Sequence, residues 1–258
     1  VVERNFRGMV KRCRDFGRDL AREPVEVGPT THFMMGGVVI DTACRTAVEG
    51  LFAAGEDTGG VHGANRLGGN GVAESTVFGG IAGDVIAECV LSRRMPDIVA
   101  AALEDSARRL AAPLARSATG DLYDLQRELR DVMWEKVGLV RDGDGLRQAL
   151  AAIDEIAGRL ERVGVPGGAA FNLAWQDWLN LVNQTAVARL IALSALERRE
   201  SRGAHWRRDF PAAAPGPLFT VRAGLRGGAP AVWTEPVTLT RAAPGVSAPA
   251  SSVVEIGD

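Results

Sequence analysis

Apolar residues recur at helical spacing through the second half of the chain. From Asp121 to Leu196 they repeat every three or four positions, and in the first two helices they are Leu122, Leu125, Leu129, Val132 and Met133, then Leu146, Leu150, Ile153, Ile156 and Leu160. This spacing places them on one helical face. Turn-forming breaks at 142–145 and 165–168 separate three such groups. Short breaks favour antiparallel neighbours, so the pattern predicts a helical bundle over residues 121–211.

The first half of the chain has a mixed pattern. Apolar residues at helical spacing predict one helix from Phe6 to Leu20, which Pro24 would end. Val38–Ile40 and Leu51–Ala54 are short apolar runs typical of buried strands. A helix is then expected to begin near Asn70 or Gly71, with Asn70 as its cap and an apolar side made of Val72, Val77, Phe78, Ile81, Val85 and Ile86.

These patterns predict four parts. Residues 1–95 hold the strands and the loop before the helix, residues 96–120 are an Ala- and Arg-rich linker with short helices, and residues 121–211 are the bundle. Residues 212–258 are expected to be an irregular extension, in which 231–233 adds a strand and about the last fifteen residues are disordered.

Composition excludes several functional classes. The 258 residues are 46% hydrophobic with a formal net charge of -2, so we expect a soluble protein with no general attraction for nucleic acid or anionic lipid. No uninterrupted apolar run reaches the roughly 18 residues of a membrane span. Cys13, Cys44 and Cys89 are too scattered for a disulfide framework or a cysteine metal site, which favours a reducing compartment and no metal.

The loop Val61–Asn70 has the residue types expected of an anion site. It contains His62, Asn65, Arg66 and several glycines within ten residues. A guanidinium can fork onto a carboxylate with two parallel hydrogen bonds. Glycines let the backbone approach a flat ligand closely. The loop therefore predicts a site where a small carboxylate and a planar cofactor meet.

Four motifs together resemble the flavoprotein subunit of succinate dehydrogenase and fumarate reductase. They are Pro29–Gly37, Gly50–Glu56, Val61–Asn70 and Glu200–Pro211, in the family's order and at about its spacing. Several long motifs in order are more specific than one glycine pattern. The departures are Phe33 in place of the family's tyrosine and 71–72 in place of serine-leucine. Neither departure changes the charge of the site.

The resemblance implies an α+β fold: the C-terminal portion of an FAD-binding α/β domain, then a helical bundle and an irregular tail. The chain has no complete glycine-rich pyrophosphate turn. We therefore expect it to be the C-terminal part of a longer flavoprotein, without the N-terminal FAD segments and the capping domain that delivers the proton. Alone it is expected to be inactive.

The resemblance also assigns roles by residue. His32 and Arg66 match the positions that bind the substrate carboxylates. Glu56, His62, Asn70, Gly71 and Val72 match positions around FAD. No residue of this chain is expected to be catalytic in the sense of transferring the proton. Ser201, Arg202 and His205 belong to the last motif, for which we expect a docking or interdomain role.

The function implied is interconversion of succinate and fumarate, a C4 dicarboxylate pair, by hydride transfer with FAD. Electrons would pass to an iron-sulfur subunit, and the membrane would be met only through partner subunits, with the protein in the cytoplasm or at the inner face of the cytoplasmic membrane. L-aspartate oxidase is the alternative within the family, and Thr30 and Gly68 favour the succinate and fumarate interpretation. A non-catalytic helical interaction fragment is the alternative from another class.

Overall fold

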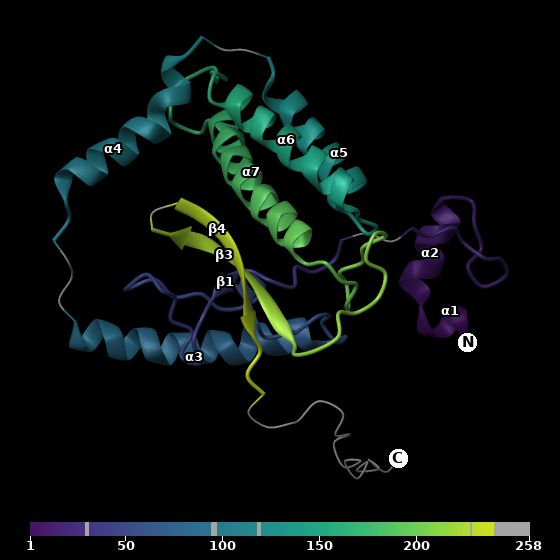
Figure 1. The fold of residues 1–258 in the computed structure, drawn as a ribbon. Helices are drawn as coiled ribbons and strands as arrows, with labels where there is room; N and C mark the ends of the chain where they lie inside the picture. Colours follow the sequence, from purple (N-terminus) through teal and green to yellow (C-terminus); the bar gives the residue numbers. More distant parts are fainter. Residues whose placement is uncertain (29–30, 94–96, 118–119, 228, 240–258) are drawn as a thin grey trace. The chain divides into compact units, whose positions relative to one another are not determined.

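The computed structural model describes residues 1–28, 31–93, 97–117, 120–227 and 229–239. Helices dominate the described residues (Figure 1), and the strands form two small sheets of two strands each. The α+β prediction is therefore confirmed. Two compact units divide the chain, Val1–Arg93 and Arg94–Asp258.

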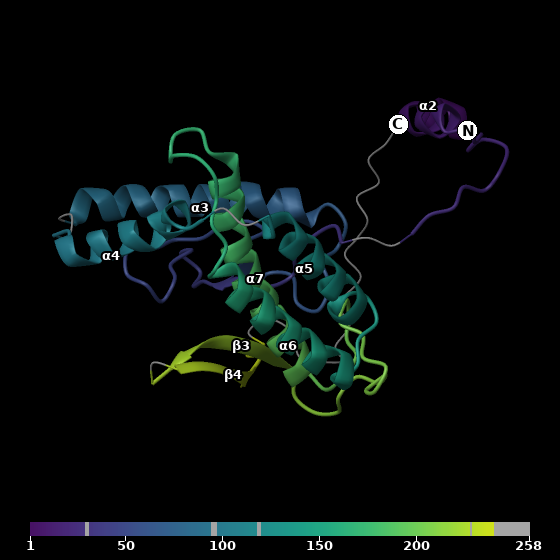
Figure 2. The same cartoon turned by 90° about the horizontal axis from the view of Figure 1, so that it is seen from above.

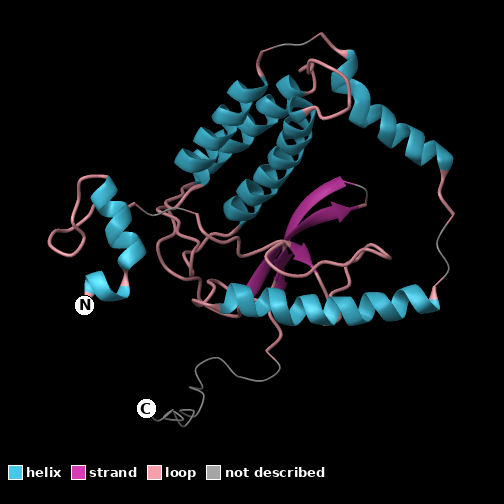
Figure 3. Cartoon of the chain, turned by 180° about the vertical axis from the view of Figure 1, so that it is seen from behind, coloured by secondary structure: helices cyan, strands magenta, loops and turns pink. Residues whose placement is uncertain are grey.

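Three helices form the core of the second unit. They are α5 (Leu122–Val137), α6 (Gly143–Leu160) and α7 (Leu173–Glu197), which pack side by side in Figures 1 and 3. The bundle prediction is confirmed, because the periodic apolar residues are those that become buried. The fully buried ones include Leu125, Leu146, Ile153, Ile156 and Leu181.

Side-chain caps define where two of these helices begin. The Asp142 carboxylate accepts a hydrogen bond from the Gly145 amide at 2.8 Å, and Asn172 Oδ1 accepts one from the Trp175 amide at 3.0 Å. Each cap satisfies a backbone donor that has no partner within its helix. The breaks seen in the sequence are therefore helix starts as well as turns.

The segments before and after the bundle are more regular than the sequence indicates. In the 96–120 segment, α4 (Ala100–Ala111) runs for twelve residues and continues into the 3-10 helix η1 (Ala112–Ala115). After the bundle, β3 (Phe219–Arg226) and β4 (Ala229–Pro236) pair antiparallel over eight residues each, as Figure 2 shows. The expected irregular extension is thus wrong for residues 219–226 and 229–236, while the strand expected at 231–233 is confirmed. The expected disorder falls outside the described residues.

The hairpin forms because its side chains pair across the strands. Arg222 lies opposite Trp233, and its Nε contacts the Glu235 carboxylate at 3.1 Å. The Arg226 guanidinium stacks 4.0 Å from the centre of the Trp233 ring. Cross-strand pairs of this kind stabilise a ladder. The Pro, Ala and Gly content of the segment favours irregular structure, so the sequence did not predict this strand pairing.

The helix expected from Phe6 to Leu20 is two shorter helices. They are α1 (Val2–Asn5) and α2 (Arg7–Asp15), separated at Phe6, which has non-helical backbone angles. Gly17, with φ of 76°, ends α2 seven residues before Pro24. Its amide bonds the Arg14 carbonyl, and the next amide bonds the Cys13 carbonyl, as in a Schellman motif. A glycine at this position stops a helix before any proline is reached.

The two expected strands are only half right. Strand β1 (Val38–Val39) exists but pairs in parallel with β2 (Thr58–Gly59). Residues 51–54 are not a strand, because their backbone bonds back onto residues 44–48 in a local turn, with one isolated bridge at Phe52. Val38 and Val39 are exposed in this structure, so the expectation of buried strands is wrong.

The helix expected at the end of the loop is α3 (Asn70–Ser92). Its N-cap is Gly69, with φ of 84°, and no side chain of the described residues caps it. The prediction that Asn70 is the cap is therefore wrong by one residue. Of the residues on its expected apolar side, Phe78, Ile81 and Val85 are partly buried, while Val72, Val77 and Ile86 are exposed.

Two described helices are long and apolar enough to cross a membrane. They are α3 and α7, which pass by length and composition although neither contains the uninterrupted apolar run considered above. The core helix of a soluble protein passes the same test, and α7 contributes Trp178, Leu181 and Ala192 to the bundle core. This feature is therefore weak evidence for a membrane segment.

Candidate functional site

The loop between β2 and α3 is anchored by a buried carboxylate. Glu74, in the second turn of α3, has a side chain that is 1% exposed and lies 2.7 Å from His62 Nε2. Its other oxygen accepts a hydrogen bond from the Thr58 hydroxyl at 3.1 Å, and Thr58 is itself buried. Because buried polar groups need hydrogen-bond partners, this contact fixes the side chain of His62.

An aromatic ring joins His62 to Arg66. The Phe33 ring meets the His62 ring edge to face, with centroids 5.3 Å apart and planes inclined by 75°. The Arg66 guanidinium carbon lies 4.3 Å from the centre of the same ring. Such a contact attracts the cation to the face of the ring. Sequence positions 33, 62 and 66 are thus brought into one stack.

Arg66 keeps hydrogen-bonding capacity that its neighbours do not use. Its backbone amide donates to Met35 Sδ at 2.9 Å, and Nη1 contacts the Leu67 carbonyl at 3.3 Å. Nε is buried and has no hydrogen-bond partner among the described residues. A buried donor without an acceptor costs free energy. An acceptor supplied by a bound anion would remove that cost.

The start of α3 lies against this stack. A Cβ placed on Gly71 would lie 3.1 Å from Phe33 Cε2 and 3.5 Å from Arg66 Nη1, so glycine leaves the room that both side chains occupy. The amides of Gly71 and Val72 belong to the first turn and have no acceptor within the helix. Together with the helix dipole they favour a negative charge at this end.

Glu56 and His32 have fewer contacts than His62 and Arg66 among the described residues. Glu56 Oε1 accepts a hydrogen bond from the Met34 amide at 2.9 Å, which ties the Gly50–Glu56 turn to the motif before β1. The side chain is otherwise exposed. His32 is exposed and makes no side-chain hydrogen bond within the described part of the chain. Thr30 lies outside the described residues.

Both ends of the chain match known families. Residues 1–72 match the FAD binding domain family, and residues 126–247 match the family described as fumarate reductase flavoprotein C-term. An uncharacterized FAD-dependent oxidoreductase of Methanocaldococcus jannaschii is 46% identical over 213 residues, covering 82% of this chain. An L-aspartate oxidase of Rhodospirillum rubrum is 40% identical over 221 residues, covering 81% of this chain and 70% of that protein. The chain belongs to the succinate dehydrogenase/fumarate reductase flavoprotein family.

A solved member of this flavoprotein family has the same fold. The flavoprotein chain of E. coli quinol fumarate reductase superposes with a TM-score of 0.84 at 27% identity, over 95% of this chain. The matched part is 43% of that chain, and 38% of the M. jannaschii relative. The chain thus spans about two fifths of these proteins, and its fold is that of their C-terminal part.

The residues present fit the FAD of this family. The amides at the start of α3 have no side-chain cap, and the buried Nε of Arg66 has no hydrogen-bond acceptor among the described residues. Gly71 keeps a side chain out of this position. Gly71 and Val72 would hold the electron-rich edge of the isoalloxazine ring, and Glu56 and His62 stay the predicted contacts of FAD. The backbone amide of Asn70 donates to the Leu67 carbonyl, so only the side chain of Asn70 is available to contact FAD.

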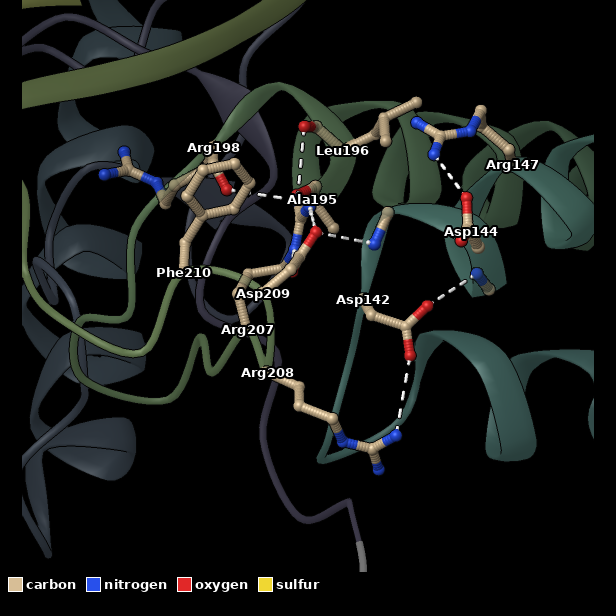
Figure 4. A network of polar contacts seen from close by, with 12 residues as sticks. Asp142, Asp144, Arg147, Ala195, Leu196, Arg198, Arg207, Arg208, Asp209 and Phe210 are labelled. Carbon is tan, nitrogen blue, oxygen red and sulfur yellow. Dashed lines mark hydrogen bonds and ion pairs between the residues drawn. The ribbon is translucent and has the colours of Figure 1, made fainter.

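The last family motif closes one end of the bundle in the second unit. Arg207 has a side chain that is 2% exposed and donates to the Ala195 and Leu196 carbonyls at the end of α7 (Figure 4). It also pairs through two nitrogens with the Asp209 carboxylate, at 2.8 and 2.7 Å. Asp209 in turn accepts from the Gly143 amide at the start of α6, at 2.9 Å. This motif therefore joins two helix ends.

Glu200 and His205 complete this arrangement. Burial alone would raise the pKa of Glu200, but hydrogen bonds from Arg202, the Ala214 amide and Arg198 lower it overall. Burial, followed by the positive charge of Arg141, lowers the pKa of His205 to about 4, so its imidazole is neutral at neutral pH. These contacts join the last family motif to the helix ends, and the docking or interdomain role expected for Ser201, Arg202 and His205 stays a prediction.

Sequence reasoning missed the residue that organises the site loop. Glu74 lies in a helix that the sequence predicts, but its burial depends on His62, which is twelve residues away. The sequence signal that could have identified Glu74 is its place one turn inside the helix that follows the loop Val61–Asn70. Thr58, the second partner of Glu74, had no signal of its own.

Proposed function

We propose that this chain is the substrate-binding C-terminal part of an FAD-dependent flavoprotein that interconverts succinate and fumarate. The observation that carries the proposal is Arg66: its guanidinium is stacked on Phe33, its Nε is buried without an acceptor, and it lies beside the open start of α3. A dicarboxylate oxygen supplies the acceptor that Nε lacks. The family match to fumarate reductase flavoproteins supports the same reaction.

The chain's own residues bind and orient in this proposal. Arg66 holds one carboxylate of a C4 dicarboxylate through two nitrogens, which fixes its distance and its angle together. His32, exposed at the preceding motif, donates a hydrogen bond to a substrate carboxylate. The amides of Gly71 and Val72 hold negative charge at the start of α3. Bound FAD supplies the hydride chemistry, and the proton is delivered from outside this chain.

Partners and location follow from the same proposal. The relatives include proteins named as flavoprotein subunits, which supports a multisubunit assembly. We propose that the electrons pass to an iron-sulfur subunit and that membrane contact is made only through partner subunits. The flavoprotein would then lie in the cytoplasm or at the inner face of the cytoplasmic membrane.

L-aspartate oxidase activity is the second candidate, favoured by the 40% identity to the R. rubrum enzyme over 70% of its length. Both substrates present a dicarboxylate to Arg66, and they differ in the amine that only L-aspartate carries. The two proposals therefore predict the same effect of Arg66 and different substrates for flavin reduction.

The test uses the intact flavoprotein. Flavin content is measured together with dye reduction by succinate or L-aspartate and with oxidation of a reduced dye by fumarate. Arg66→Ala is expected to keep the flavin and to lose several orders of magnitude of activity, because the carboxylate is no longer positioned. Arg45→Ala is the matched control, since Arg45 is an exposed arginine of the same unit. A parent without flavin would make the non-catalytic interaction fragment the better interpretation. A fully active Arg66→Ala variant would refute the assignment of Arg66 to the substrate carboxylate.

A further inference from the structure

Glu74 is a buried acid to which the proposed reaction gives no role. Its side chain is 1% exposed, and both oxygens are engaged, with His62 Nε2 at 2.7 Å and the Thr58 hydroxyl at 3.1 Å. The Thr58 hydroxyl also lies 2.8 Å from the Gly55 carbonyl, next to Glu56. The carboxylate therefore ties the turn before β2, the site loop and α3 to one point.

The contacts of Glu74 continue to the substrate arginine. A carboxylate on Nε2 selects the imidazole tautomer with its proton on that nitrogen, which fixes the plane of the His62 ring. The His62 ring meets Phe33 at 75°, and Phe33 presents a face to the Arg66 guanidinium 4.3 Å from its centre. Each contact restricts the next, so the orientation of Arg66 depends on a residue that it does not touch.

We propose that Glu74 is a positioning residue of the substrate site, acting through His62 and Phe33 to set the orientation of Arg66. The proposal rests on the proposed function, because it assigns Arg66 to the substrate carboxylate. It adds that a buried acid outside the substrate contacts organises the site, and that the Phe33 ring couples the orientation of His62 to that of the Arg66 guanidinium. Glu74 itself contacts neither substrate nor cofactor.

The kinetic test compares Glu74→Ala and Glu74→Gln in the intact flavoprotein. Glu74→Ala is expected to keep bound flavin and to raise the KM for the dicarboxylate about 10- to 100-fold, since small displacements of a binding group have effects of this size. Glu74→Gln keeps an oxygen that can accept from His62 and is expected to stay within a few-fold of wild type. Glu88→Gln, on the exposed side of α3, is the matched control and is expected to have no effect.

A double-mutant comparison separates positioning from general destabilisation. If Glu74 acts through His62, the variant with both Glu74→Ala and His62→Ala has the same KM as His62→Ala alone. Independent effects that multiply, or a Glu74→Ala enzyme with wild-type KM, would overturn the proposal. If Glu74→Ala loses flavin through misfolding, the same comparison is made with Glu74→Gln and Glu74→Asp, of which only the shorter Asp should raise KM.

A spectroscopic measurement separates failure of this inference from failure of the proposed function. Proton-nitrogen spectra of histidine-labelled protein, with His62→Gln as the assignment control, report which imidazole nitrogen carries the proton. His62 is expected to be protonated at Nε2 in wild type and to become a mixture of tautomers in Glu74→Ala. An unchanged signal would refute the role of Glu74 whether or not the enzyme turns over a dicarboxylate.

Discussion

Replacing Arg207 with alanine is expected to destabilise the second unit by about 3 kcal/mol. The side chain is 2% exposed and donates to the Ala195, Leu196 and Arg198 carbonyls as well as to Asp209. Removing one partner of a buried ion pair costs about 3–5 kcal/mol. We take the lower end, because the Asp209 side chain is 36% exposed and water can replace part of its pairing. Such a loss is a large share of the 5–15 kcal/mol typical of a domain.

Tryptophan fluorescence can follow this loss selectively. All five tryptophans lie in the second unit, at positions 134, 175, 178, 206 and 233. Urea unfolding at neutral pH would compare wild type with Arg207→Ala and Arg207→Lys, which keeps the charge but lacks the planar fork. Arg208→Ala is the control, since the Arg208 side chain is 70% exposed and its nearest carboxylate oxygen, on Asp142, is as far as 3.8 Å away. A loss of less than about 1 kcal/mol for Arg207→Ala, equal to that of Arg208→Ala, would refute the reasoning.

Three further outcomes are expected. Ile153→Ala, at a site 1% exposed in the bundle, should cost about 2–5 kcal/mol in urea unfolding, and a loss near zero would place Ile153 outside the core. Burial and the charge of Arg141 lower the pKa of His205 to about 4. The free energy of unfolding contributed by neutral His205 is therefore fully present above the ordinary pKa of about 6.5 and is lost as the pH falls towards 4. The expected loss is about 2 kcal/mol after allowance for partial exposure. His205→Gln should flatten that part of the pH profile, measured as unfolding free energy. Gly37→Ala would place a Cβ against the Asp57 carbonyl and should lower the flavin content of the intact protein, whereas Gly79→Ala, where a Cβ meets nothing within 4 Å, should leave it unchanged.

The bundle could be predicted because its information is local. Leu146, Ile153 and Leu160 repeat at helical spacing, and one helix needs only a neighbour with the same pattern to bury them. The end of α2 differs from the prediction because Gly17, seven residues before Pro24, takes a left-handed conformation that ends the helix. Residues 51–54 differ from the predicted strand because a short apolar run does not reveal that its backbone hydrogen-bonds to residues close in sequence.

The candidate site was predictable by motif and only partly by physics. Arg66 and His62 stand in the sequence loop and remain neighbours in space through Phe33. The burial of Glu74 is a tertiary property that no spacing encodes. The roles given to His32 and Glu56 stay predictions, because their partners would be ligand atoms that the chain does not contain.

The closure of α7 by Arg207 has a consequence for classifying relatives of this chain. The motif that contains it holds helix ends together, with Ser201 bonded to the Phe210 carbonyl and Glu200 to the Ala214 amide. Selection on such a motif acts on architecture, so enzymes with different substrates can share it. A search that relies on this motif would gather succinate, fumarate and aspartate enzymes into one group. Residues that distinguish enzymes by substrate should be sought at positions 30–37 and 61–72, which contain the proposed ligand contacts.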